Sequence, residues 1–180
     1  MPSLADRCRA IELLVLDVDG VLTDGSIVYA EDGPEIKGFH VRDGSGLKIW
    51  RHLGKRAAII TGRDSFIVAR RARELDLEPV IQGALDKWPA YQRVLAETRL
   101  RPEQVCAIGD DVPDIPLLQN CGLAVAVADA CPDVREVTHY VTSVAGGKGA
   151  VREVIELILR VQGSWQGLVE GYRNKRFEQA

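Results

Sequence analysis

Short apolar runs spaced along the chain constrain its fold more than any other feature. Four of them cover residues 13–16, 57–60, 105–108 and 123–127. Continuous apolar runs of this length are typical of strands that are buried on both faces of a sheet. Shorter strand candidates lie at residues 80–81 and 140–141. The sequence therefore predicts a buried, mostly parallel sheet.

Amphipathic stretches separate these runs. Apolar residues recur every three to four positions in residues 46–53, 65–75, 87–98, 115–120 and 150–161, which predicts helices. Alternation of strands and helices is typical of an α/β protein. We expect a Rossmann-like, doubly wound parallel sheet with helices on both faces. In such sheets, ligands bind beyond the carboxyl ends of the strands.

Residues 26–41 interrupt the alternation with two short β-rich runs. The sequence SIVYAEDGPEIKGFHV carries Asp-Gly and Pro between them, which predicts a small β-hairpin inserted after the first strand. A lone two-stranded hairpin is marginally stable in water, so we expect this one to pack against another surface.

Composition excludes several classes of partner. A length of 180 residues favours one domain, and a net charge of −3 argues against nucleic-acid binding through bulk positive charge. No apolar run approaches the roughly 20 residues of a membrane span. The four cysteines lack metal-ligand spacing, and no secretory signal peptide is recognisable. We expect a cytoplasmic protein.

Five carboxylates follow two of the predicted strands. Asp17 and Asp19 come directly after the first strand, and Asp110, Asp111 and Asp114 follow the strand at 105–108. If these strands are neighbours, the acids meet at one edge of the sheet and repel one another unless a cation lies between them. Clustered carboxylate oxygens favour Mg²⁺.

Hydrogen-bond donors follow the second strand. Thr61, Gly62 and Arg63 suit a phosphate cradle, and Lys87 at the start of a helix adds a cation. Each residue alone has a plainer interpretation: Thr61 as a helix N-cap, Lys87 as a solvated lysine, and Asp111 as a helix cap. Their occurrence together and in order favours a phosphoryl-transfer site.

These motifs resemble those of the haloacid dehalogenase superfamily of phosphohydrolases. DVDGVLTDG matches the first motif, ITGR the second, the lysine of ALDKWPAY the third and GDDVPDIPLL the fourth. The longer strings FHVRDGSGLKIW, AAIITGRDSFIVARRARELDL and AGGKGAVREVIELILRVQG are similar to the 3-deoxy-D-manno-octulosonate 8-phosphate (KDO 8-phosphate) phosphatases. The resemblance spans about residues 12–162.

The resemblance implies roles for the carboxylates. Asp17 would be the nucleophile that forms an aspartyl-phosphate, and Asp19 would protonate the leaving alkoxide and then deprotonate water. Mg²⁺ would be held by the carboxylates of Asp17 and Asp110 and by the backbone carbonyl of Asp19. Asp111 and Asp114 would orient the catalytic lysine or a metal-bound water.

The resemblance also implies which residues hold the substrate. Thr61, Gly62 and Lys87 would steady the phosphoryl oxygens. Arginines suit a substrate that carries both a carboxylate and a phosphate, and Lys48 stands where many relatives have arginine. The residues implied to bind substrate are Asp19, His40, Val41, Arg42, Asp43, Gly44, Lys48, Gly62, Arg63, Arg71 and Lys87.

The spacing between motifs leaves no room for a cap domain. Asp19 and Thr61 are separated by 41 residues, and Lys87 and Asp110 by 22. We expect one capless domain over residues 1–162 and a mobile C-terminal tail over residues 163–180. In the family that the chain resembles, a homotetramer supplies the cover: four hairpins form a central barrel, and a neighbour covers each site.

Three other functions remain open at this level. A nine-carbon keto-sugar acid 9-phosphate, of the sialic-acid or deoxynonulosonate type, shares the carboxylate and hydroxyl pattern of KDO 8-phosphate. A non-catalytic tetramerisation module would not need all of Asp17, Asp19, Thr61, Lys87 and Asp110. A protein phosphatase would suit an open, capless core.

Overall fold

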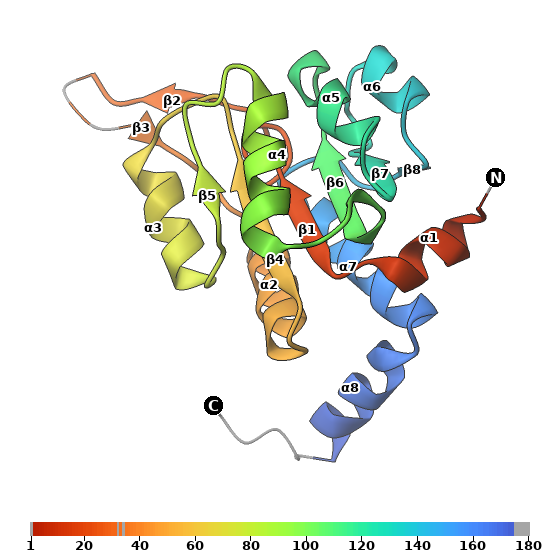
Figure 1. Ribbon diagram of the computed structural model, residues 1–180. Coiled ribbons are helices and arrows are strands. Elements are labelled where there is room, and N and C mark those ends of the chain that lie inside the picture. Colours follow the sequence, from red (N-terminus) through yellow and green to blue (C-terminus); the bar gives the residue numbers. More distant parts are fainter. Residues whose placement is uncertain (1, 32, 34, 175–180) are drawn as a thin grey trace.

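A six-stranded parallel sheet forms the centre of the computed structural model, which describes residues 2–31, 33 and 35–174 (Figure 1). The strand order is β5-β4-β1-β6-β7-β8. The strands are β1 (Leu13–Leu16), β4 (Arg56–Ile60), β5 (Val80–Ile81), β6 (Val105–Gly109), β7 (Leu123–Ala126) and β8 (Tyr140–Val141). All six predicted strands are confirmed, and the order places β1 between β4 and β6.

Helices cover both faces of the sheet, as predicted. Helices α2 and α7 pack together behind it, whereas α4 lies in front of it and packs on α5 (Figure 1). The helices are α1 (Leu4–Ala10), α2 (Val41–His52), α3 (Phe66–Glu74), α4 (Lys87–Thr98), α5 (Ile115–Leu118), α6 (Pro132–Glu136), α7 (Ala150–Val161) and α8 (Ser164–Arg173), with short 3₁₀ turns at Pro102–Gln104 and Val112–Asp114. In the described part of the chain, no helix has the length and apolar character needed to cross a bilayer.

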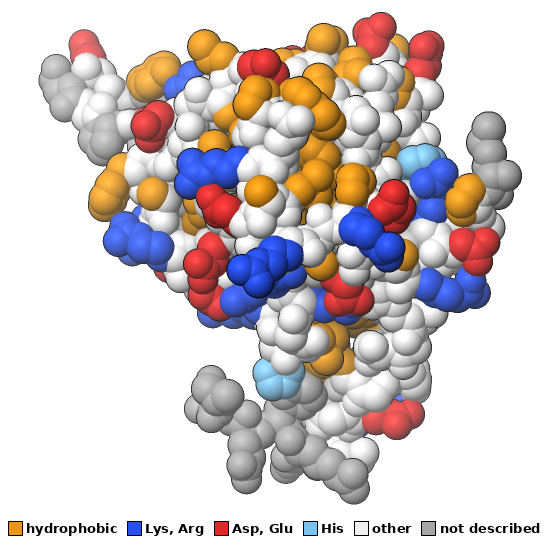
Figure 2. All heavy atoms as spheres, in the orientation of Figure 1, with side chains coloured by type: hydrophobic (Ala, Val, Ile, Leu, Met, Phe, Trp, Pro, Cys, Tyr) orange, Lys and Arg blue, Asp and Glu red, His pale blue; other side chains and the backbone are white. Residues whose placement is uncertain are grey.

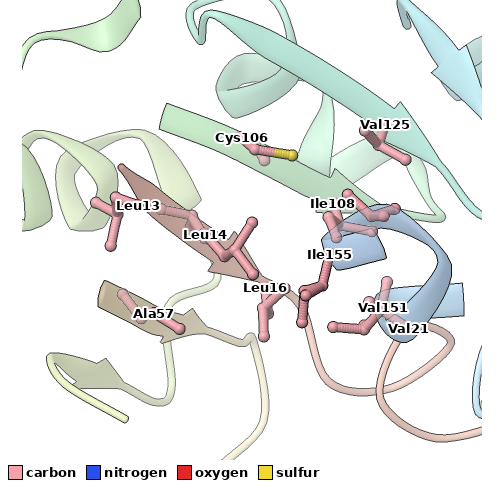
Figure 3. Packing of buried hydrophobic residues seen from close by; sticks show 14 of the residues in the cluster. Leu13, Leu14, Leu16, Val21, Ala57, Cys106, Ile108, Val125, Val151 and Ile155 are labelled. Atoms are coloured by element: carbon pink, nitrogen blue, oxygen red, sulfur yellow. The ribbon is translucent and has the colours of Figure 1, made fainter. Parts of the chain in front are cut away.

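The core lies between β1 and the helix layer behind it. Leu14 and Leu16 are fully buried, and Figure 3 shows Val151 and Ile155 of α7 beside the end of β1 (Figure 3). The apolar stripe of α7 is buried along its length, so this helix is anchored by the hydrophobic effect at about 1.5–3 kcal/mol per large side chain. This packing fixes the end of β1, where the motif carboxylates begin.

The inserted hairpin is confirmed. Strands β2 (Val28–Tyr29) and β3 (Glu35–Ile36) pair antiparallel, with Val28 opposite Ile36 and Tyr29 opposite Glu35. It is the small second sheet at the upper left of Figure 1. Between Asp19 and Thr61 the described chain holds this hairpin, α2 and β4.

The segment after Gly163 differs from the expected mobile tail. Ser164–Arg173 forms α8, and two of its apolar side chains, Trp165 and Leu168, are buried. The ring of Trp165 contacts the guanidinium groups of Arg152 and Arg160 on α7, which lie 5.0 and 5.3 Å from its centre. These contacts dock the helix on the domain. Residues 175–180 of the expected tail lie outside the described residues.

Candidate active site

The turn after β1 carries the first two carboxylates of the site. Asp17 and Asp19 are both partly buried, and Gly20 follows with a φ of +97°, a conformation that favours glycine. A Cβ at Gly20 would overlap the side chain of Asp110 at the end of β6. Glycine at this position therefore lets the two strand ends approach closely.

A buried lysine joins two of the carboxylates. Lys87 Nζ lies 2.9 Å from Asp17 Oδ1 and 2.6 Å from Asp114 Oδ1, and Lys87 is only 5% exposed. Burial alone would lower the pKa of Lys87, but the two ion pairs outweigh it and raise the pKa above its usual value. The plainer interpretation of Lys87 as a solvated lysine is wrong.

The two remaining acids of the fourth motif have different environments. Asp114 Oδ2 accepts backbone hydrogen bonds from Asp110 (3.1 Å) and Asp111 (3.4 Å), so both oxygens of Asp114 are engaged. Asp111 is exposed, and its side chain caps the 3₁₀ turn by accepting from Val112 N at 2.8 Å. The interpretation of Asp111 as a cap is confirmed. Asp114 forms an ion pair with Lys87, and its role in orienting that lysine stays a prediction.

Asp17, Asp110 and Asp114 form a cluster that could hold a metal ion. One carboxylate oxygen from each lies within 4.8 Å of the others. Asp110 Oδ1 is buried and has no hydrogen-bond partner. Burial, together with the negative charges of its neighbours, raises the pKa of Asp110 to about 8. The pKa of Asp17 rises to about 6 for the same reasons, although Lys87 opposes the rise.

These features fit a divalent cation. Because both oxygens of Asp114 are engaged, the free oxygen of Asp110 and the carboxylate of Asp17 are the available ligands. A hard cation there would relieve the repulsion between the carboxylates and satisfy the unpaired oxygen. The predicted third ligand, the backbone carbonyl of Asp19, stays a prediction.

Thr61 lies at the end of β4, next to β1. It is 2% exposed. Its backbone N–H donates to the carbonyl of Ile81, and its carbonyl accepts from the N–H of Ala84. The N-cap of α3 is Ser65, so the interpretation of Thr61 as that cap is wrong. Gly62 follows in a partly buried position. Both residues lie at the carboxyl edge where a phosphoryl group would bind.

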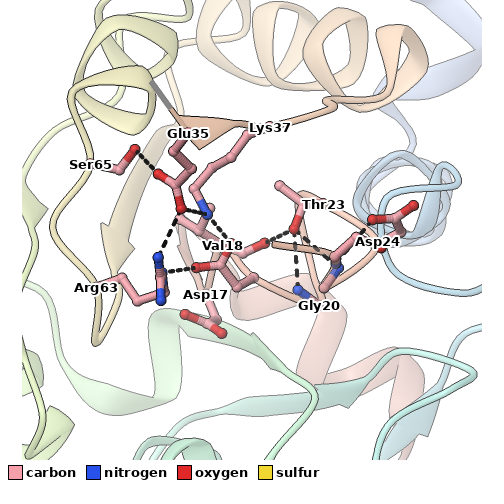
Figure 4. A network of polar contacts seen from close by, with 12 residues as sticks. Asp17, Val18, Gly20, Thr23, Asp24, Glu35, Lys37, Arg63 and Ser65 are labelled. Atoms are coloured by element: carbon pink, nitrogen blue, oxygen red, sulfur yellow. Dashed lines mark hydrogen bonds and ion pairs between the residues drawn. The ribbon is translucent and has the colours of Figure 1, made fainter. Parts of the chain in front are cut away.

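The hairpin supplies residues that sequence reasoning missed. Arg63 Nη2 donates to Glu35 Oε1 at 2.9 Å and to the Tyr29 hydroxyl at 3.2 Å. Lys37, directly after β3, pairs with Asp19 and with Glu35. Figure 4 shows Glu35, Lys37 and Arg63 converging above the turn that follows β1 (Figure 4). The only signal in the sequence was the need of a marginal hairpin for a packing partner.

Most residues of the predicted substrate loop line the start of α2. His40 is the N-cap of this helix, and its Nδ1 accepts from Arg42 N at 3.3 Å. Val41, Arg42 and Lys48 are exposed. These side chains are accessible to a ligand or to another protein surface, and their role in binding substrate stays a prediction.

Asp43 is the member of this loop that the structure places inside the protein. It is 1% exposed, and its carboxylate accepts from the backbone N–H groups of Gly149 (3.2 Å) and Arg152 (2.8 Å). It thereby caps α7 from a different helix. Burial raises the pKa of Asp43 despite these bonds. The carboxylate has a structural role that sequence reasoning did not predict.

Arg71 borders a hollow of about 440 Å³ beside the start of α2. Its guanidinium stacks on the ring of Phe39 at 5.6 Å and pairs with Glu74 at 3.2 Å. A Cβ at Gly44 would overlap this guanidinium, so glycine lets α2 and α3 approach closely. The hollow is lined by Phe39, Val41, Phe66, Ile67, Arg70, Arg71 and Glu74.

Comparison with known proteins agrees with this geometry. Residues 77–155 match the family model of the haloacid dehalogenase-like hydrolases. The 3-deoxy-D-manno-octulosonate 8-phosphate phosphatase KdsC of Yersinia pestis is 46% identical over 89% of this chain and 86% of its own length. The KdsC protein of Escherichia coli K12 is 45% identical over 87% of this chain and 84% of its own length.

A solved structure extends the likeness to three dimensions. The 3-deoxy-D-manno-octulosonate 8-phosphate phosphatase of Moraxella catarrhalis, in complex with magnesium ion, phosphate ion and KDO, superimposes with a TM-score of 0.91. It is 39% identical, and the match covers 93% of this chain and 97% of that one.

The parallel sheet and the Asp17–Lys87–Asp114 cluster at its carboxyl edge are those of a haloacid dehalogenase-like hydrolase. Within that class, the identity of 43–46% over most of the chain is decisive. The chain belongs to the family of the 3-deoxy-D-manno-octulosonate 8-phosphate phosphatases.

Proposed function

We propose that this protein hydrolyses KDO 8-phosphate to KDO and inorganic phosphate, a step in lipopolysaccharide synthesis, with Mg²⁺ as its cofactor. The observation that carries the proposal is the contact of Lys87 with both Asp17, which follows β1, and Asp114. Asp19 lies two residues after Asp17. A phosphatase needs both acids: one to accept the phosphoryl group and one to handle the proton of the leaving group.

Asp17 acts as the nucleophile. A carboxylate oxygen of Asp17 attacks phosphorus, and the bond between phosphorus and the sugar oxygen breaks. Asp19 gives its proton to the departing alkoxide, leaving KDO and an aspartyl-phosphate. Asp19, now a carboxylate, takes a proton from water, whose oxygen attacks phosphorus and releases inorganic phosphate and free Asp17.

Cationic and neutral donors stabilise the charge that shifts onto the phosphoryl oxygens. Lys87 is fixed by Asp17 and Asp114, so its ammonium is held in place before substrate arrives. Thr61 and the Gly62 N–H, at the end of the neighbouring strand, supply neutral donors. Preorganised donors lower the barrier because they need no reorientation during the reaction.

The carboxylates of Asp17 and Asp110 and the carbonyl of Asp19 would hold Mg²⁺. When bound, the cation neutralises the repulsion between the carboxylate nucleophile and the anionic phosphate. The unpaired Asp110 oxygen and the mutual repulsion of the clustered acids support this assignment.

Residues around the start of α2 and α3 recognise the sugar acid. Arg63 and Arg71 suit the anionic groups of the substrate, since guanidinium groups bind carboxylates and phosphates through two parallel hydrogen bonds. The half-buried His40 and the exposed Val41 and Arg42 complete this surface, with Lys48 supplying a further charge.

A homotetramer completes the site. The side chains of Ile27, Val28 and Tyr29 on the hairpin are 45–66% exposed, and Phe66 at the start of α3 is 77% exposed. Figure 2 shows hydrophobic side chains along the upper edge of the molecule, where the strands of Figure 1 end (Figure 2). Exposed apolar side chains near an open active site favour burial against a second copy of the chain.

Four free cysteines support a reducing compartment, the cytoplasm.

The test measures kcat/KM for phosphate release in the presence of Mg²⁺. KDO 8-phosphate is compared with a sialic-acid 9-phosphate and with p-nitrophenyl phosphate. A strong preference for the eight-carbon sugar supports the proposal. A preference for the nine-carbon sugar keeps the chemistry but changes the substrate, and no turnover of any ester favours a tetramerisation module.

A further inference from the structure

The hairpin places a buried cation against the proposed general acid. Lys37 Nζ forms an ion pair with Asp19 Oδ1 and lies 3.3 Å from Glu35 Oε1. The side chain of Lys37 has no exposed surface. A buried ammonium is costly unless it is paired and hydrogen-bonded, so these two carboxylates account for its position.

Glu35 anchors this lysine to the body of the domain. Its Oε1 accepts from Arg63 Nη2 at 2.9 Å and its Oε2 from Ser65 Oγ at 2.9 Å. Ser65 is itself fixed, because its backbone N–H donates to Gln82 Oε1 at 2.9 Å. Glu35 therefore connects the hairpin to the start of α3 through both of its oxygens.

Both oxygens of Asp19 face a cation. Oδ1 meets Lys37, and Oδ2 lies 3.7 Å from Arg63 Nε, an atom that has no hydrogen-bond partner. Figure 4 shows Lys37, Glu35, Arg63 and Ser65 as one continuous network above the turn after β1 (Figure 4). The contact through Lys37 is the closer one, so it constrains the rotamer of Asp19 most strongly.

We propose that Lys37, held by Glu35, is a positioning residue that aims the carboxyl group of Asp19 at the oxygen of the leaving group. The inference rests on the proposed function, in which Asp19 is the general acid. Proton transfer needs the donor within hydrogen-bond reach of the accepting oxygen. A freely rotating Asp19 would spend less time in that geometry.

Esters whose leaving groups differ in basicity distinguish a role in positioning Asp19 from a role in binding the phosphoryl group. A sugar alkoxide is a strong base and needs a proton as it departs, whereas p-nitrophenolate is a weak base and departs without one. A defect in the aim of Asp19 therefore slows the sugar ester selectively. A defect in phosphate binding slows both esters alike.

The experiment compares kcat/KM of Lys37→Met and the wild type on KDO 8-phosphate and on p-nitrophenyl phosphate. This constant reports the steps up to departure of the leaving group, so later hydrolysis of the aspartyl-phosphate does not enter. We expect a loss of about 10- to 100-fold on the sugar ester, a part of the 10²–10⁴-fold that a general acid contributes. On the aryl ester we expect less than about a threefold loss, and Lys37→Arg should restore most of the activity on the sugar ester.

Lys55→Met is the matched control. Lys55 is also mostly buried and ion-paired, at 3.1 Å to Glu12, but it lies before β4 at the opposite edge of the sheet. Its kcat/KM should equal that of the wild type on both esters. Circular dichroism and thermal melting check the fold of each variant. If Lys37→Met does not fold, Glu35→Gln carries the test, because it should show the same selective loss.

Equal losses on both esters, or no loss on the sugar ester, would overturn the inference. Asp19→Asn separates that result from a failure of the proposed function. If Asp19→Asn slows the sugar ester selectively and Lys37→Met does not, only the inference fails. If Asp19→Asn lacks that selectivity, its role as the acid fails, and the inference fails with it.

Discussion

Replacing Asp43 with alanine should destabilise the protein by about 3 kcal/mol. The change removes the acceptor of two backbone N–H groups at the start of α7, those of Gly149 and Arg152. Each buried donor left without a partner costs about 1–3 kcal/mol. Removing the buried carboxylate also removes its desolvation cost, the same burial that raises the pKa of Asp43. This gain offsets part of the loss from the two unpaired donors. For a chain of this size, the loss corresponds to a fall in Tm of roughly 6–12 °C.

Thermal melting followed by circular dichroism, at constant pH and protein concentration, measures the effect. Asp43→Asn keeps one acceptor oxygen, so its Tm should fall less than that of Asp43→Ala. Ser3→Ala is the control: Ser3 caps α1 at an exposed position, and its loss should cost about 1 kcal/mol. If Asp43→Ala melts within 2 °C of the wild type, the cap on α7 does not stabilise the fold and the reasoning is refuted.

Three further predictions concern the nucleophile, the metal site and α8. Asp17→Asn should reduce phosphate release to background while the circular dichroism spectrum stays that of the wild type; turnover near the wild-type rate would exclude Asp17 as nucleophile. The pKa of Asp110, about 8, lies above the ordinary value of 3.8. The native state thus binds more protons than the unfolded state between these values, and the metal-free protein should lose stability as pH rises from about 4 to 8. Saturating Mg²⁺ should therefore raise Tm more at pH 8 than at pH 6, and an equal rise at both would contradict the assignment. Trp165→Ala should lower the free energy of unfolding by about 3–5 kcal/mol in urea titrations, and a loss below 1 kcal/mol would show that α8 is not docked.

The sequence was most informative where local pattern and site chemistry coincide. Asp17 and Lys87 were predicted to share one phosphoryl-transfer site, because their motifs occur together and in order along the chain. The structure places Lys87 Nζ 2.9 Å from Asp17 Oδ1. The parallel sheet itself was predictable on the same grounds, since short buried runs alternate with amphipathic helices. The order of its strands, with β1 between β4 and β6, was not predicted.

Contacts between distant segments could not be predicted in this way. Asp43 and Gly149 lie 106 positions apart, and no local pattern shows that an acid in one helix caps another. Lys37 reaches Asp19 only because the hairpin folds back, and a two-residue strand does not encode that direction. Helix α8 was not predicted, because the sequence after Gly163 is rich in glycine and charged residues and its apolar face is short.

Chemical trapping of the phosphorylated enzyme tests the account most directly. KDO 8-phosphate is turned over with Mg²⁺ and quenched in acid, and sodium borohydride then reduces any acyl phosphate to the corresponding alcohol. Peptide mass spectrometry should find homoserine at position 17 in the wild type and none after Asp17→Asn. Steady turnover with no homoserine at position 17, or with homoserine at another aspartate, would contradict the assignment of Asp17 as the residue that accepts the phosphoryl group.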